Sequence, residues 1–418
     1  MSKTEPNRPP EADVAIVGGG TAGLALAAEL KRSGVGRVVV LEREKAAGGI
    51  PRHCGHYPFG LWEYQRLLKG PEYAARNVET AQALGVEIRT QTTVTQLHPG
   101  GRLSLSTPDG LQDLRASRVV LCTGVRESSR PQRFIGGDRP LGVMTTGALQ
   151  SLVFLNHMRP FSKPVILGSE LVSFSAIDTC RHLGIRPVAM VEELDRIVTH
   201  KALQPYLKVR GVPLFTGIGQ PRIIGAQHVE ALEFTDATGD HQRIETDGII
   251  ISGQFRPEAA LLYNSHLEVD PGSGGPVIDQ FGQCTDPAFY SAGNLLRPAE
   301  TSGWCWREGV AAAKRIAQDL NSPGHEVKGT IRLTTRDPAL KFVLPQRLCL
   351  TERPGGMKKM QIGLRTPANG TLRAMVGEKC IWSSRINSRP VRRIQRSLAG
   401  LLGVGAGADI RLEFKPET

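Results

Sequence analysis

The 418-residue sequence lacks several features that define common protein classes. Its seven cysteines stand singly and none forms a C-x-x-C pair, so a zinc ribbon, an iron–sulfur run and a thioredoxin-like dithiol all lack their ligands. No apolar run approaches the roughly 20 residues of a membrane-spanning helix. Residues 1–11 contain no apolar core of a signal peptide. We therefore expect a short disordered lead at residues 1–11, no export and a cytoplasmic protein, which also fits the odd, dispersed cysteine count.

Most of the net charge lies in one part of the sequence. Apolar residues make up 40% and charged residues 22%, as in globular proteins. The formal net charge is +12, and residues 331–418 contain 17 lysines and arginines against 6 aspartates and glutamates. This basic segment is either a solvated face or a docking surface for an acidic protein partner or an anionic membrane. Few aromatic side chains accompany it, so we expect no nucleic acid partner.

Two stretches have the pattern of a βαβ unit. In the first, an apolar run at residues 13–17 precedes a helical pattern at 21–33 and a second buried run at 37–42. The second repeats the order strand, helix, strand at residues 164–168, 171–183 and 187–192.

These patterns predict an α/β fold with two Rossmann-like dinucleotide-binding domains and a small β-rich C-terminal domain. A strand at 288–292 and a helix at 302–320 close the first domain, which is therefore discontinuous. After the N-S-P-G of residues 321–324, short alternating strands and turn signals indicate the basic β domain. The predicted boundaries are residues 12–125 and 246–322 for the first domain, 126–245 for the inserted second domain and 327–418 for the β-rich domain.

Residues 18–23 (G-G-G-T-A-G) match the G-x-G-x-x-G pattern of dinucleotide-binding loops. The match follows a buried strand, opens a helix and lies within a βαβ unit of about 30 residues, which is the context that the pattern requires. Gly18 permits the tight turn, Gly20 lets a pyrophosphate approach the backbone, and Gly23 lets helix and strand pack closely. The N–H groups at the helix start, around Thr21 and Ala22, then face the phosphates.

Glu42 ends the second strand, 19 positions beyond Gly23. An acid at a spacing of about 20 residues hydrogen-bonds the adenosine ribose in such domains. A carboxylate there repels a 2′-phosphate, so the nucleotide is FAD or NAD and not NADP.

Further segments favour FAD. Gly48-Gly49 stands where flavoproteins bring the chain back over the pyrophosphate, and residues 121–124 (L-C-T-G) resemble the A-T-G that links the two domains of such flavoproteins. Residues 291–294 (S-A-G-N) resemble the A-x-G-D that holds the ribityl chain, with Asn294 in place of the usual Asp, and a helix starting near Gly303-Trp304 would point at the flavin. We predict FAD as cofactor and assign no catalytic residue and no metal ligand. The candidate cofactor-binding residues are Gly18, Gly20, Thr21, Ala22, Gly23, Glu42, Arg43, Gly49, Val94, Thr123, Gly124, Gly293, Asn294, Gly303 and Trp304.

The second βαβ unit carries a degenerate NAD(P)-type fingerprint. Residues 168–173 read G-S-E-L-V-S, with Glu170 at the second glycine position and Ser173 at the third, where its side chain would crowd the contact between helix and strand. Glu170 would place a carboxylate against an incoming pyrophosphate, a repulsion on the order of several kcal/mol when partly desolvated. Either Glu170 turns away, or this domain does not use NAD(P)H.

Residues 53–56 (H-C-G-H) contain one cysteine where disulfide reductases carry a redox pair. Dithiol chemistry is therefore not expected, and the His-Cys-x-His spacing is too compressed for the usual metal ligands. Cys54 either lies beside the flavin or belongs to the loop structure. Residues 304–306 (W-C-W) are interpreted as packing rather than chemistry.

Longer strings extend these motifs and resemble one group of proteins. Together they resemble the FAD-binding alpha subunits of heteromeric dehydrogenases such as opine oxidase, hydrogen cyanide synthase and hydroxyproline or proline dehydrogenase. A related flavoprotein accompanies some glycerol-3-phosphate dehydrogenases. This group lies within the two-dinucleotide-binding-domain pyridine nucleotide-disulfide oxidoreductase superfamily, and the resemblance covers roughly residues 12–320. The strings lie at residues 48–61, 70–74, 136–140, 145–148, 292–294 and 303–309.

The resemblance implies a division of labour between subunits. In such complexes an amino-acid-oxidase-like flavoprotein subunit oxidises a small amine or amino acid, and the alpha subunit passes electrons on, often with a [2Fe–2S] protein. Some longer relatives end in a cysteine-rich [2Fe–2S] domain, whereas the tail here has only Cys349 and Cys380, so such a centre would lie on another chain. Two alternatives stay open, namely a free-standing NAD(P)H-dependent reductase of a small acceptor and a non-catalytic FAD-bound assembly module.

Overall fold

The computed structural model describes residues 10–199, 201–297, 300–322, 326–365, 368–388 and 393–417. Residues 1–9 of the predicted lead and 323–324 of the predicted boundary turn lie outside this part of the chain. By its internal contacts the chain divides into unit 1 (Met1–Gly49, Ala74–Val125 and Pro257–Thr418) and unit 2 (Ile50–Tyr73 and Arg126–Arg256). The predicted domain boundaries stay a prediction.

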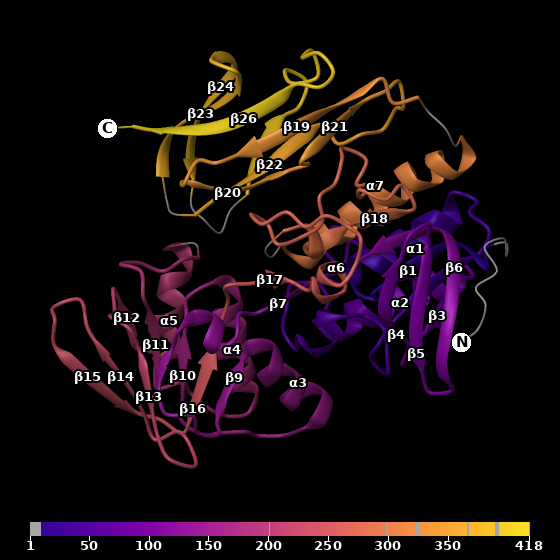
Figure 1. The fold of residues 1–418 in the computed structure, drawn as a ribbon. Coiled ribbons are helices and arrows are strands. Elements are labelled where there is room, and N and C mark those ends of the chain that lie inside the picture. Colours follow the sequence, from indigo (N-terminus) through magenta and orange to yellow (C-terminus); the bar gives the residue numbers. More distant parts are fainter. Residues whose placement is uncertain are drawn as a thin grey trace. The chain divides into compact units, whose positions relative to one another are not determined.

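A sheet of mainly parallel strands forms the centre of unit 1 (Figure 1). Its strands are β1 (Ala12–Val17), β2 (Val38–Leu41), β3 (Glu87–Arg89), β4 (Thr93–His98), β5 (Arg102–Thr107), β6 (Gly110–Leu121) and β18 (Phe289–Ser291). Their order is β3-β2-β1-β6-β5-β4, and β18 also pairs with β6. The parallel register places Val17 beside Leu41 and Leu121, and Leu121 beside Ser291, so four carboxyl ends meet at one edge. Open α/β sheets bind their ligands at this edge.

Helices of unit 1 cover this sheet. They are α1 (Thr21–Arg32), α6 (Ala260–Tyr263), α7 (Ser302–Asn321), the 3-10 turn η4 (Gly293–Leu296) and most of α2 (Gly70–Ala83). Alanine and leucine dominate α1, which favours a helix, and Lys31 and Arg32 lie near its negative C-terminal end. The helices α1 and α7 touch closely, since a Cβ added at Gly309 would overlap the Ala22 carbonyl oxygen.

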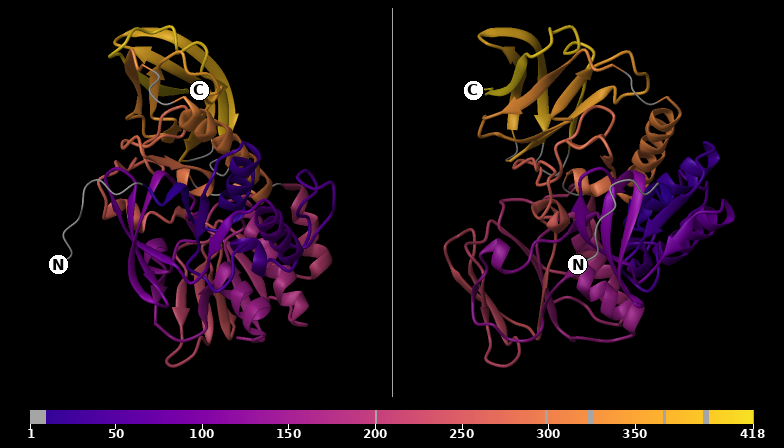
Figure 2. Two further views of the ribbon diagram at one scale, coloured as in Figure 1. Left: turned by 90° about the vertical axis from the view of Figure 1, so that its right-hand side faces the viewer. Right: turned by 45° about the vertical axis from the view of Figure 1, so that its right-hand side comes forward.

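The C-terminal part of unit 1 consists of strands. They are β19 (Gly329–Thr335), β20 (Leu340–Leu344), β21 (Arg347–Leu350), β22 (Lys359–Leu364), β23 (Ala368–Val376), β24 (Lys379–Ser388), β25 (Ile394–Ser397) and β26 (Asp409–Pro416). They form one sheet ordered β21-β19-β26-β23-β24 and another ordered β20-β22-β25, both drawn in orange to yellow in Figure 2. Along β26, Ile410 and Leu412 are buried in a hydrophobic cluster that also includes Ile362 of the smaller sheet. Arg411, between the two β26 residues, is exposed, so this strand shows the period of two expected for one buried face.

Unit 2 contains a second parallel sheet and a smaller sheet that is mainly antiparallel. The first is ordered β12-β11-β10-β16-β9 and the second β15-β14-β13-β8. The short strands β7 (Val125–Arg126) and β17 (Arg256–Pro257) pair where the chain passes between the units. The elements of unit 2 are β8 (Gly136–Gly137), β9 (Val143–Thr145), α3 (Thr146–Asn156), β10 (Pro164–Leu167), α4 (Leu171–His182), β11 (Ala189–Glu192), α5 (Gln204–Arg210), β12 (Leu214–Thr216), β13 (Arg222–Ile224), β14 (Ala231–Thr235), β15 (His241–Glu245), β16 (Gly248–Ile251) and the 3-10 turns η1 (Ile50–His53), η2 (Pro131–Arg133) and η3 (Lys201–Leu203).

The predicted α/β class with Rossmann-like sheets is confirmed. Within the described ranges, no helix combines the length and apolar character needed to cross a membrane.

Candidate functional site

The glycine loop of unit 1 joins β1 to α1 at the carboxyl edge of the sheet. Gly18 has φ +107°, a value that favours glycine, and a Cβ there would lie 2.5 Å from the Cys122 carbonyl oxygen. A Cβ at Gly23 would overlap the Gly18 carbonyl oxygen. At Gly20, by contrast, the nearest atom to an added Cβ is Gly49 Cα at 3.8 Å. The first and third glycines therefore serve packing, whereas a methyl group at the second would make only an ordinary van der Waals contact.

The start of α1 has no acceptor from the protein's own side chains among the described residues. Gly20 is its N-cap, no side chain caps it, and its first turn carries no acidic residue. Helix α3 of unit 2 differs, because Thr145 Oγ1 accepts from Ala148 N and Glu127 accepts from Gly147 N at 2.7 Å. An uncapped helix start is a ready site for an anion, and α4, the helix after the second loop, likewise lacks a side-chain cap.

Glu42 is buried at the end of β2. One carboxylate oxygen accepts from Gly19 N at 2.9 Å and the other from Glu44 N at 2.9 Å. The sequence predicted a contact between Glu42 and a ribose, but did not reveal these two bonds, which orient the carboxylate. A carboxylate has about four lone-pair positions, so acceptor capacity is left for a hydroxyl ligand.

Two further glycines lie against this loop from distant parts of the sequence. A Cβ at Gly49 would lie 2.7 Å from Gly20 Cα, and a Cβ at Gly293 would lie 2.7 Å from Ala22 Cβ. Gly48 N donates to Gly19 O at 2.7 Å. The structure thus brings the predicted Gly48-Gly49 and Ala292-Gly293 segments to the start of α1.

Other predicted cofactor residues lie around the same edge. Thr123 Oγ1 donates to the Glu258 carbonyl at 2.8 Å, and the Gly124 carbonyl accepts from Glu258 N at 2.9 Å, so this linker is fixed to the segment that begins at residue 257. Arg43, about half exposed, lies 3.9 Å from the Glu258 carboxylate. The Val94 side chain is buried in the core cluster.

The side-chain amide of Asn294 both donates and accepts a hydrogen bond within its loop. Its Nδ2 donates to the Glu300 carbonyl at 3.1 Å, and its Oδ1 accepts from Glu300 N at 2.8 Å. An ionised aspartate could accept the second bond but could not donate the first. The departure from the usual Asp therefore coincides with a loop that needs both a donor and an acceptor.

A part-buried group of charges surrounds the first turns of α7. Arg297 is fully buried and pairs with Glu308, while Arg393, next to β25, pairs with Glu300 at 2.8 Å and with Glu308 at 3.1 Å. Burial raises the pKa of Glu300, with the arginines opposing that effect. The sequence did not reveal this group, because its members lie up to 96 positions apart and each is unremarkable alone.

The predicted residues Gly303 and Trp304 lie in the first turn of α7. The Trp304 ring, 43% exposed, has the guanidinium of Arg393 4.8 Å from its centroid and that of Arg307 at 5.1 Å. Cys305 is buried, and burial raises its pKa to about 12. The interpretation of residues 304–306 as packing stays a prediction, because Cys305 is buried whereas the Trp304 ring is partly exposed.

Unit 2 repeats the backbone of the glycine loop 150 positions later. Gly168 has φ +113°, and a Cβ there would overlap the Ser252 carbonyl oxygen, as at Gly18. Gly168 N donates to Val191 O at 2.8 Å, and Gly18 N donates to Leu41 O at 2.9 Å. Both loops are therefore Rossmann loops in their backbone.

In this second loop Glu170 stands at the position of Gly20, and its carboxylate bonds the segment that follows β16. Glu170 Oε1 accepts from Gln254 N at 2.7 Å, and Glu127 Oε1 accepts from Gly253 N at 3.1 Å, so two carboxylates lie at the carboxyl edge of the sheet. Burial raises the pKa of Glu127. Arg133, whose side chain is 3% exposed, donates to the Leu167 carbonyl at 3.2 Å. The Glu170 carboxylate disfavours a dinucleotide pyrophosphate at this edge.

Two serines of the second loop are held by hydrogen bonds, and one of them, Ser173, stands at the third glycine position of the fingerprint. Ser169 Oγ donates to Glu192 at 2.6 Å. Ser173 is fully buried and its hydroxyl bonds that of Ser252 at 2.9 Å, as does Thr146. Ser173 was expected to crowd the contact between helix and strand, and the structure instead accommodates it with a hydrogen bond.

Cys54 lies in a closely packed turn of unit 2. Its Sγ donates to Ile50 O at 3.4 Å, and burial, with a smaller effect of Glu127, raises its pKa to about 12. A thiol of such pKa stays protonated at neutral pH and is a poor nucleophile. Of the two interpretations, these facts favour loop structure. Within the described residues, no three His, Cys, Asp or Glu side chains form a metal-binding group.

One Rossmann sheet with a glycine loop and a second whose loop carries Glu170 form the framework of a two-domain dinucleotide-binding oxidoreductase. The chain belongs to the pyridine nucleotide-disulphide oxidoreductase family, whose model matches residues 12–315. Proteins of this family generally bind FAD.

Curated relatives are subunits of larger enzymes. An opine oxidase subunit from Agrobacterium tumefaciens (strain Ach5) is 25% identical over 68% of this chain and 61% of that protein. The alpha subunit of sarcosine oxidase from Corynebacterium sp. (strain P-1) is 28% identical over 60% of this chain and 27% of that protein. The hydrogen cyanide synthase subunit HcnB of Pseudomonas aeruginosa is 26% identical over 72% of each. The match thus spans less than two thirds of the first two relatives.

Solved structures share the fold. The thioredoxin reductase of T. acidophilum superposes with a TM-score of 0.62 and 23% identity over 74% of this chain and 99% of that chain. L-proline dehydrogenase from P. horikoshii gives a TM-score of 0.56 and 19% identity over 75% and 56%. At these identities the likeness concerns the fold alone.

Proposed function

We propose that this chain binds FAD in unit 1 and is the electron-relaying flavoprotein subunit of a multi-subunit dehydrogenase. Its substrate would be a small amine or amino acid of the opine, hydroxyproline or glycine type. The observation that carries the proposal is the contrast between the two loops. The loop of unit 1 carries no side chain at Gly20, whereas Glu170 and Arg133 occupy the matching edge of unit 2.

The residues of unit 1 fit FAD. The pyrophosphate would lie beside Gly20 and accept from the N–H groups of Thr21 and Ala22, where no side chain competes. Glu42 would accept from the adenosine ribose with the lone pairs that Gly19 and Glu44 leave. When bound, FAD supplies the two-electron redox chemistry. The other predicted contacts around Gly49, Thr123 and Gly293 belong to this proposal.

The side chains at this edge of unit 2 argue against direct reduction by NAD(P)H. A nicotinamide dinucleotide would meet the carboxylates of Glu170 and Glu127 and would have to displace Arg133 from the Leu167 carbonyl. Electrons would then come from another subunit, as the names of the opine oxidase, sarcosine oxidase and hydrogen cyanide synthase relatives suggest. The proposed partners are an amino-acid-oxidase-like flavoprotein and a [2Fe–2S] protein.

Anaerobic stopped-flow absorbance of the FAD-loaded chain tests this. We expect no bleaching of the flavin band with NADH or NADPH and full bleaching with dithionite, which is the control for a reducible flavin. Rapid bleaching by either nucleotide would instead support a free-standing reductase. If the dithionite-reduced chain transfers no electrons to any partner that co-purifies with it, the assembly module replaces the relay.

A further inference from the structure

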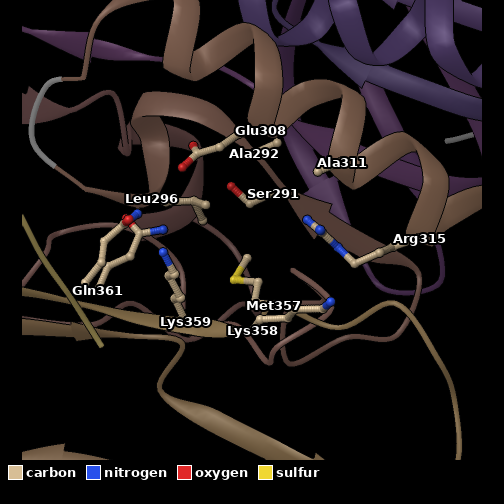
Figure 3. A pocket seen from close by; sticks show the side chains of 11 residues that line it. Ser291, Ala292, Leu296, Glu308, Ala311, Arg315, Met357, Lys358, Lys359 and Gln361 are labelled. Carbon is tan, nitrogen blue, oxygen red and sulfur yellow. The ribbon is translucent and has the colours of Figure 1, made fainter. Parts of the chain in front are cut away.

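A cavity of about 280 Å³ lies within unit 1, between α7 and the C-terminal strands (Figure 3). Glu308, Ala311 and Arg315 line it from α7, and residues 357–361 line it from the opposite side, at the start of β22. This face of α7 is distinct from the one that packs on α1, where Gly309 touches Ala22. Ser291 and Ala292 complete the wall, so the cavity adjoins the segment that the sequence predicts beside the ribityl chain.

The charges around this cavity do not balance. Arg315, Lys358 and Lys359 line it, and among the described residues none of the three has a carboxylate within ion-pair distance. The lining carboxylate, Glu308, is already paired with Arg297 and Arg393. Three cations thus face a space whose single anion is neutralised by other groups.

Arg315 is held in place although it lacks an ionic partner. Its side chain is buried, its Nε donates to the Phe281 carbonyl at 2.9 Å, and burial lowers its pKa to about 10, so it stays charged at neutral pH. Figure 3 shows its guanidinium pointing into the cavity. The charges of Glu308 and Asp279 offset part of the cost of burying this cation without contacting it, and an anion in the cavity would offset more.

Gln361 adds a donor, and apolar groups complete the wall. Gln361 Oε1 accepts from Arg393 at 2.9 Å, which leaves its Nε2 amide as the free end. Leu296 and Met357 provide apolar surface. Lys358 and Lys359 are exposed, so the cavity is accessible from solvent.

We propose that this cavity binds a phosphate group, either as free phosphate or as a small phosphate monoester. Arg315, Lys358 and Lys359 contact the phosphate oxygens, and Leu296 and Met357 face the remainder of an ester. Three cations suit a dianion better than a single carboxylate, and lysine and arginine are the usual phosphate-binding side chains. The apolar wall favours the ester. This proposal does not depend on the function proposed above.

Isothermal titration calorimetry of the full chain, loaded with FAD and at constant ionic strength, tests it. The probes are phenyl phosphate and inorganic phosphate, with phenol as the uncharged control. We expect saturable binding of phenyl phosphate, and a Kd increased at least about tenfold in the double variant K358Q/K359Q because two charge-assisted contacts are lost. Tighter binding of phenyl phosphate than of inorganic phosphate identifies an ester site, whereas equal binding identifies a free phosphate site.

The matched control is K328Q/K415Q, which removes the same charge from two exposed lysines elsewhere in the C-terminal part. It should leave both Kd values within about twofold, since distant exposed charges are screened by salt. Thermal melting checks that both variants fold. Absence of saturable binding, or equal weakening in the control, would overturn the proposal. So would binding that persists in K358Q/K359Q, because such binding belongs to another anion site.

Discussion

Replacing Gly20 with alanine separates the binding role of the glycine loop from its structural role. Gly20 has extended backbone angles that any residue adopts, φ −81° and ψ −172°. The added Cβ would have Gly49 Cα as its nearest neighbour, at the ordinary van der Waals distance of 3.8 Å. The chain without FAD should therefore tolerate the methyl group.

The size of the effect follows from this geometry. We expect the free energy of unfolding of FAD-free Gly20→Ala to lie within about 0.5 kcal/mol of the wild type, as for substitutions that create no clash. The same methyl group stands where the pyrophosphate would approach the backbone, and overpacking of this kind costs about 1–3 kcal/mol. The Kd for FAD should then rise roughly fivefold to more than a hundredfold.

Gly23→Ala is the matched comparison, since its methyl group overlaps the Gly18 carbonyl oxygen and touches Ile16. This variant should lose stability whether or not FAD is present. Urea unfolding of the FAD-free proteins gives the free energy of unfolding, and fluorescence titration with FAD gives the Kd for FAD. Wild-type FAD affinity in Gly20→Ala would refute the placement of the pyrophosphate beside Gly20.

Three other results are expected. Arg393→Gln should lower the free energy of unfolding by about 2 kcal/mol in urea titrations, because it leaves the part-buried carboxylates of Glu300 and Glu308 with one charged partner fewer. Arg411, which pairs with Glu413 at the surface, is the control, and Arg411→Gln should lower the free energy of unfolding by less than about 1 kcal/mol. Equal losses of stability in the two variants would contradict the argument from burial. Burial raises the pKa of Glu127. The wild type should therefore lose stability relative to Glu127→Gln as the pH rises above about 4, the pKa of an unfolded glutamate. A difference in stability that does not change with pH would argue against the raised pKa. Ellman's reagent at pH 8 should label the exposed Cys380 rapidly, and Cys380→Ser should abolish that fast phase. Fast labelling of the buried thiols would be inconsistent with the pKa values near 12 at Cys54, Cys122 and Cys305.

Local patterns made the Rossmann elements predictable. The strand, glycine loop and helix at residues 12–32 are contiguous, and each glycine has its reason within that stretch or against an adjacent strand. The helix expected at about 171–183 is observed as Leu171–His182, with residue 183 as its C-cap. Boundaries of this kind depend on nearby residues and so leave a signal in the sequence.

Long-range pairs left no comparable signal. The contact of Gly293 with Ala22 joins residues 271 positions apart, and the pairing of Arg393 with Glu300 depends on how the C-terminal strands meet α7. Glu170 is intermediate between the locally predictable elements and these long-range pairs. Its sequence position indicated a conflict with pyrophosphate, but only the fold shows that its carboxylate accepts from Gln254 N.

The ion pairs of Arg393 determine what a C-terminal truncation of this chain would remove. Truncation near residue 322 would, from the strand pattern, remove an independent module. It would also remove the arginine that neutralises Glu300 and Glu308 beside the first turns of α7, and one cation from the face of Trp304. The shortened protein would then carry uncompensated negative charge at the very helix whose start was predicted to face the flavin, so its redox behaviour would not represent that of the whole chain.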